Sequence, residues 1–178
     1  MKENRNEPIP VESVQESVER SLSLSRNCAQ AAFRCLERQW NLESSGLPKA
    51  LSFYPCGTLF LGGTCGAALG CMMAMGLALG KEDPDPGEDA GEAARLLEAF
   101  CRRMVKQRGG ITCRDILKFD PGLDPSTAPR SASGKKRSIS HVQRCAPTIT
   151  ECVKIALELL ANREKDRESV GTMPAAAK

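Results

Sequence analysis

The sequence predicts an all-α protein, a small helical domain of about six helices packed around one buried central helix. Apolar residues recur at helical spacing through most of the chain, whereas no segment shows the strict alternation of a half-buried strand. Only 4% of the residues are aromatic, fewer than a large β-sandwich core uses. The length of 178 residues fits one domain.

The first third of the chain predicts two helices after a disordered lead over residues 1–10. Aliphatic residues then recur at helical spacing, at Val11, Val14, Val18 and Leu22. A second helix is expected over about 27–40, with one apolar face that packs inward. A short helical pattern over 46–54 ends at Pro55.

The most apolar part of the chain runs from Leu59 to Gly80 and contains no charged residue. It is long enough to span a bilayer, but its glycines weaken the hydropathy and its flanks lack basic clusters and an aromatic belt. We therefore expect a buried central helix over about 64–80 and no membrane association. A helix that is apolar on every side belongs at the centre of a helical domain.

Two helices are expected after the central one. The acidic, proline-rich segment 81–91 leads into a helix over about 91–107, where its carboxylates suit the helix dipole. Gly109 and Gly110 end that helix. A short helix is expected next, over about 112–119.

The last part of the chain predicts a loop and one more helix. Segment 121–140 is rich in Pro, Ser and Gly, which indicates a flexible loop, and it carries the basic cluster 135–137. The final helix is expected over about 147–162, and a polar tail follows over 163–178. The single domain thus covers residues 11–162.

Charge and cysteine content restrict the class of protein. Lys plus Arg total 25 and Asp plus Glu total 22, so the net charge is 25 − 22 = +3, and we expect no nucleic-acid partner. The nine cysteines cannot all pair within one chain, and the polar N-terminal segment does not resemble a signal peptide. We expect a cytoplasmic protein, where so many thiols are typical of metal binding or redox chemistry.

Four cysteines share one predicted context, at or just before the first turn of a helix. They are Cys28, Cys65, Cys113 and Cys145. Asn27, Thr64 and Thr112 precede three of them as N-cap residues, and Pro147 follows the fourth near an N1 position. A helix N-terminus favours a thiolate and lowers the pKa of the cysteine. Thiolates are nucleophiles in disulfide exchange and also ligands of iron–sulfur clusters, so both roles stay open.

The remaining cysteines are expected to have other roles. Four lie inside predicted helices among apolar residues and should act as small hydrophobic side chains: Cys35, Cys71, Cys101 and Cys152. The role of Cys56, in a Pro-Cys-Gly turn, stays open. The one histidine, His141, is expected in a solvated loop, and its participation with Cys145 also stays open. The chain has no C-x-x-C pair.

The order and spacing of the four cysteines resemble the C_GCAxxG_C_C family of redox-active proteins. The resemblance covers about residues 11–162 and is carried by residues 27–31, 63–70, 113–117 and 145–147. It implies a small helical redox protein whose partner is an unknown redox protein, such as an oxidoreductase or a transporter component. The family's name describes its cysteines and not a reaction. The extra cysteines of this chain lie outside the family pattern and are alternative ligands.

Our main hypothesis is that Cys28, Cys65, Cys113 and Cys145 converge and bind an iron–sulfur cluster or another thiophilic metal for electron transfer. Gly62, Gly63 and Gly66 would then allow close backbone approach and offer N–H groups to the cofactor.

Two alternatives remain. The first is a metal-free thiol–disulfide oxidoreductase or thiol relay with Cys65 as the attacking thiolate and one of the other three, Cys28, Cys113 or Cys145, as its resolving partner. The second is a soft-metal carrier for a transporter, in which methionines beside Cys71 bind Cu(I): Met72, Met73 and Met75. The cofactor, the redox partner and association into a homo-oligomer are not determined by the sequence.

Overall fold

The computed structural model describes residues 13–25, 27–58, 61–80, 91–118 and 139–171, with side chains of the last segment described over 145–163. Over these residues the chain is all-α, as predicted, and contains no strand. The elements are α1 (Val14–Ser25), α2 (Cys28–Trp40), α3 (Leu47–Ala50), the 3-10 turn η2 (Leu51–Phe53), α4 (Gly66–Leu79), α5 (Gly91–Arg108), α6 (Cys113–Leu117) and α7 (Ile139–Gly171).

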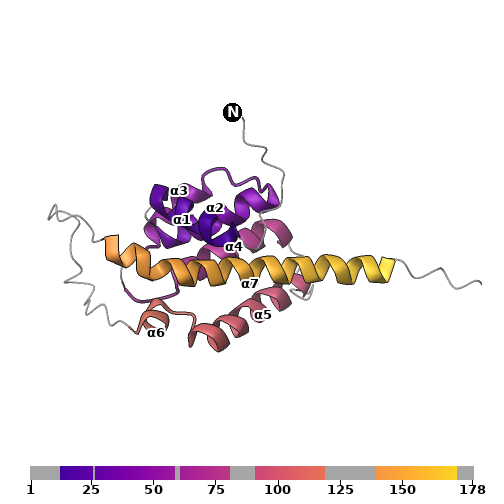
Figure 1. Ribbon diagram of the computed structural model, residues 1–178. Coiled ribbons are helices and arrows are strands. Elements are labelled where there is room, and N and C mark those ends of the chain that lie inside the picture. The colour runs from indigo at the N-terminus through magenta and orange to yellow at the C-terminus, as the bar shows by residue number, and fades with distance from the viewer. Residues whose placement is uncertain (1–12, 26, 59–60, 81–90, 119–138, 172–178) are drawn as a thin grey trace, which may run out of the picture.

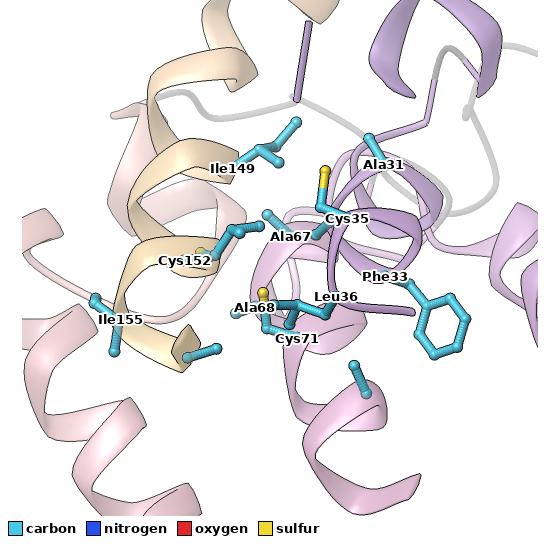
Figure 2. Packing of buried hydrophobic residues seen from close by; sticks show 14 of the residues in the cluster. Ala31, Phe33, Cys35, Leu36, Ala67, Ala68, Cys71, Ile149, Cys152 and Ile155 are labelled. Carbon is cyan, nitrogen blue, oxygen red and sulfur yellow. The ribbon is translucent and has the colours of Figure 1, made fainter. Parts of the chain in front are cut away.

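The long helix α7 crosses the molecule and contacts α1, α2 and α4 on one side and α5 on the other (Figure 1). The core lies where α2, α4 and α7 meet. Figure 2 shows Leu36 from α2, Cys71 from α4 and Cys152 from α7 directed toward this common centre. All three side chains are buried. The first two helices, the central helix and the last helix therefore share one core.

The central helix α4 is buried along its first half, where it packs against α2 through small residues. The prediction of burial on every side is wrong for its second half, where Leu77 is 46% exposed. A Cβ at Gly70 would lie 2.3 Å from the Ala29 carbonyl oxygen, closer than any real Cβ approaches. Glycine is therefore the residue that lets the two backbones come this near. In the described part of the chain, no helix is both long and apolar enough to cross a membrane.

Helix starts agree with the predicted N-caps at two positions out of three. The Asn27 side chain accepts hydrogen bonds from the amides of Ala29 and Gln30, and Thr112 accepts one from the amide of Asp115. The prediction for Thr64 is wrong. Cys65 rather than Thr64 occupies the N-cap position of α4, and its side chain caps no amide. Thr64 instead forms an isolated antiparallel bridge with Thr112.

The last helix differs from its prediction at both ends. It begins at Ile139 and not at Pro147, which lies inside it, and it continues to Gly171. Pro147 is the ninth residue of α7, so the helix lacks the hydrogen bond that an amide there would donate to the carbonyl four residues earlier. The packing of the rest of α7 outweighs this loss. Cys145 therefore lies within a helix rather than at its N-terminus. The acidic segment 81–90 and the basic cluster 135–137 fall outside the described residues.

We expect Gly70→Ala to lower the free energy of unfolding by about 1–3 kcal/mol, because the added methyl group overlaps the Ala29 carbonyl. Gly76→Ala is the matched control, since Gly76 is an exposed residue of the same helix and a methyl group added there would meet no atom within 4 Å. That change should raise stability by up to about 1 kcal/mol. Urea unfolding followed by circular dichroism measures both, and equal stability of the two variants would contradict the close α2–α4 contact.

Candidate functional site

The fold brings the four predicted cysteines together from four elements. Cys28 begins α2, Cys65 precedes α4, Cys113 begins α6 and Cys145 lies on α7. Two backbone hydrogen bonds hold the middle pair in place. The Cys65 amide donates to the Ile111 carbonyl at 2.8 Å, and the Cys113 amide donates to the Gly63 carbonyl at 2.7 Å.

All four side chains are buried, with between 5% and 9% of their surface exposed. The charge of a Cys28 thiolate raises the pKa of each of the other three, which shows that the sulfurs lie near enough to interact electrostatically. The structure thus assembles the predicted cysteines into one thiol cluster.

Cys28 is the one member of this cluster whose pKa is lowered, to about 7. The largest cause is a hydrogen bond from the Cys145 thiol, which stabilises the thiolate and outweighs burial, the cause that acts in the opposite direction. The backbone amides of Cys56 and Ala29 also donate to the Cys28 sulfur. The prediction of a thiolate at the start of α2 therefore agrees with the structure, although its main cause is a second cysteine rather than the helix end alone.

Asn27 fixes the surroundings of this thiolate. Its side-chain oxygen caps α2, and its amide group donates to the carbonyls of Leu51 and Ser52 at 3.1 and 3.2 Å. These bonds tie the start of α2 to the turn η2. The loop that follows η2 is thereby placed beside Cys28, so that the Cys56 amide reaches its sulfur.

The prediction of lowered pKa values is wrong for the other three cysteines. Burial, as the largest cause, raises the pKa of Cys65 and that of Cys113 to about 12. The pKa of Cys145 is raised as well, first because its thiol hydrogen-bonds to Cys28 and then because it is buried. Removing a thiolate from water costs more free energy at these buried positions than the helix N-terminus gains by stabilising the charge. Cys145 also lacks a helix N-terminus.

The three glycines predicted to bind a cofactor also pack the cluster. A Cβ at Gly66 would lie 2.6 Å from the Cys28 sulfur. Gly62, which has a φ of +71°, and Gly63 present carbonyls that accept hydrogen bonds from the amides of Arg114 and Cys113 at the start of α6. The Gly63 amide donates to the Gly57 carbonyl. Backbone groups of Gly63 expected to face a cofactor are therefore already paired within the protein.

The structure adds Cys56 to the cluster. It is half-exposed and sits in a run of three residues with left-handed backbone, at φ angles of +51° for Cys56, +72° for Gly57 and +62° for Thr58. Non-glycine residues seldom adopt this conformation, and a cluster of them is typical of functional sites. The sequence indicates a turn at Pro-Cys-Gly, but this local pattern does not show which residues the turn contacts in the fold.

Three of the other cysteines are core residues, as predicted. Cys35, Cys71 and Cys152 are each at most 1% exposed. The Cys35 sulfur contacts the hydroxyls of Ser17 and Ser21 at 3.6 Å, and Cys152 contacts the Met104 sulfur at 3.5 Å. Cys101, on α5, is half-buried and packs against the edge of this core. His141 lies in α7, but its side chain falls outside the described ones.

The donor chemistry of the cluster suits iron or another soft metal, but its present arrangement does not. Thiolates are the usual ligands of iron–sulfur clusters. Among the residues that the structure describes, no group of three or more His, Cys, Asp or Glu side chains is placed to hold a metal ion. The methionines proposed for Cu(I) are packing residues, because Met75 is buried and Met72 and Met73 pack against the core.

Comparison with known proteins gives one match. A family model described as "Putative redox-active protein (C_GCAxxG_C_C)" matches residues 26–159, a range that includes every cysteine discussed above. No curated protein and no solved structure gives a significant match.

We expect Cys28 to react with iodoacetamide at a rate that rises between about pH 6 and pH 8, because the thiolate forms above a pKa of about 7. Cys145→Ala removes the hydrogen bond and should move this rise toward pH 9. Peptide mass spectrometry after timed labelling follows each cysteine separately. Cys65 and Cys113 serve as internal references that stay unlabelled over this range, and a Cys28 profile unchanged by Cys145→Ala would contradict the assigned cause.

Proposed function

We propose, from the premise that this chain belongs to the C_GCAxxG_C_C family of redox-active proteins, that it is a thiol–disulfide oxidoreductase whose working pair is Cys28 and Cys145. The observation that carries the proposal is the hydrogen bond between these two thiols, which leaves Cys28 ionised near pH 7. A thiolate with a pKa near the ambient pH is the best nucleophile for disulfide exchange. This assignment replaces Cys65, whose high pKa keeps it protonated.

The reaction is a two-electron exchange with a disulfide of a partner protein. The Cys28 thiolate attacks one sulfur of that disulfide, forms a mixed disulfide and releases the other sulfur as a thiolate, which takes a proton. Cys145 then loses its proton and attacks the Cys28 sulfur. The second partner thiol leaves, and Cys28 and Cys145 end as a disulfide. The reverse sequence uses the same atoms to oxidise a partner dithiol.

The pKa of Cys145 suits its role as the second nucleophile. It is high chiefly because Cys145 donates a hydrogen bond to the Cys28 thiolate. Once Cys28 is part of a mixed disulfide, that negative charge is gone, so the main cause of the high pKa disappears. Cys145 then ionises more easily at the step that needs its thiolate. Cys65 and Cys113 stay neutral beside the pair.

An iron–sulfur cluster on Cys28, Cys65, Cys113 and Cys145 is the second candidate. It is favoured by the convergence of four thiols from four elements, since four thiolates are the usual ligand count. These four side chains would have to change their placement to hold a metal ion. A soft-metal carrier has no observation in its favour. We also propose that the protein works in the cytoplasm, where its thiols stay reduced.

The test is disulfide mapping of the reduced protein after brief treatment with oxidised glutathione. We expect a Cys28–Cys145 disulfide that dithiothreitol reverses, lost in Cys28→Ala and Cys145→Ala and retained in Cys101→Ala. Cys101 is the matched control because it is half-exposed and lies on α5, away from the cluster. Iron and acid-labile sulfide are measured on protein purified without oxygen. Near-stoichiometric amounts, lost in Cys65→Ser, would overturn the thiol mechanism in favour of the cluster.

A further inference from the structure

The working pair is poorly accessible to a protein substrate. Cys28 is 7% exposed and Cys145 is 9% exposed. Disulfide exchange needs the attacking sulfur to approach the partner's sulfur directly, along with room for the leaving sulfur. A disulfide held in a folded partner cannot easily meet that requirement at a buried thiol. A more exposed cysteine could react with the partner's disulfide and then exchange with the buried pair.

Cys56 lies beside the pair and is more exposed than either member. Its side chain is half-exposed, and its backbone amide donates a hydrogen bond to the Cys28 sulfur. The Cα atom is only about 1.5 Å from that nitrogen, so the Cys56 side chain begins next to Cys28. This hydrogen bond brings the Cys56 backbone to the Cys28 sulfur, so the two cysteines are neighbours across the loop. A negative charge on Cys56 also acts on Cys145, which places it near both members of the pair.

The loop that carries Cys56 has two further features suited to exchange. Its left-handed run over residues 56–58 holds Cys56 in a conformation that L-residues seldom adopt, so the surrounding structure must fix it. The same stretch of chain also exposes two large apolar side chains, Phe53 at 64% and Leu61 at 39%. Exposed apolar residues near a reactive thiol favour a protein partner over a small, charged disulfide.

We infer that Cys56 is a third redox cysteine, the thiol that exchanges with the partner's disulfide and passes the oxidation to Cys28. This inference rests on the proposed function. With a protein partner, Cys56 takes over the first attack from Cys28. Its thiol gives up a proton and its sulfur bonds to one partner sulfur, while the other partner sulfur leaves as a thiolate that takes up a proton. Cys28 then attacks the Cys56 sulfur, releases the second partner thiol and forms a Cys28–Cys56 disulfide. Cys145 finally attacks Cys28, which regenerates the Cys56 thiol and leaves the Cys28–Cys145 disulfide.

The intermediate can be trapped in Cys145→Ala, which cannot complete the last step. After treatment with oxidised glutathione, we expect a Cys28–Cys56 disulfide by peptide mapping. The double variant with Cys56→Ala should instead keep glutathione on Cys28. Cys145→Ala with Cys101→Ala is the matched control and should still give the Cys28–Cys56 disulfide. Persistent glutathione on Cys28 in Cys145→Ala itself would overturn the role of Cys56.

A rate measurement separates this inference from the proposed function. We expect Cys56→Ala to reduce insulin disulfides at least tenfold more slowly than the wild type, and Cys101→Ala to match the wild type. A Cys56→Ala rate within twofold of the wild type would overturn the inference while leaving the Cys28–Cys145 pair standing. If the wild type forms no Cys28–Cys145 disulfide with oxidised glutathione, the proposed function fails whatever Cys145→Ala traps.

Discussion

The close contact between α2 and α4 is the constraint on which the rest of the structure depends. Gly70 lets the α4 backbone lie against the Ala29 carbonyl, and Gly66 leaves space for the Cys28 sulfur itself. Side chains at these two positions would force the helices apart. The same contact that builds the core therefore also sets how deeply Cys28 is buried and which groups reach its sulfur.

Within this frame, the cluster holds one negative charge among several thiols. Each ionised sulfur raises the pKa of its neighbours, and burial raises them further, so a second thiolate is strongly disfavoured. Hydrogen bonds from a neighbouring thiol and from backbone amides decide that Cys28 carries the charge. After the first exchange at Cys56, the order of reaction follows from which sulfur of the Cys28–Cys145 pair is ionised at each stage.

Much of the fold follows from sequence periodicity. The apolar spacing locates the helices, and the Asn27 cap and the four cysteine positions are readable as local patterns. Other features depend on tertiary packing that a local pattern does not contain. Thr64 has the chemistry of an N-cap but pairs with Thr112, and Pro147 has that of a helix start but lies inside α7. The depth of burial that raises the pKa of Cys65 is equally invisible, as is the contact that joins Cys56 to Cys28.

The bridge between Thr64 and Thr112, with the bond from the Cys113 amide to Gly63, has a consequence for folding. It joins segments far apart in the chain, and closing such a loop costs entropy that must be met before the contact forms. Until this loop closes, Cys113 lies apart from Cys65, and both thiols are individually exposed to oxidants during synthesis. A chain that matures in reducing surroundings escapes wrong pairings that an oxidising compartment would trap.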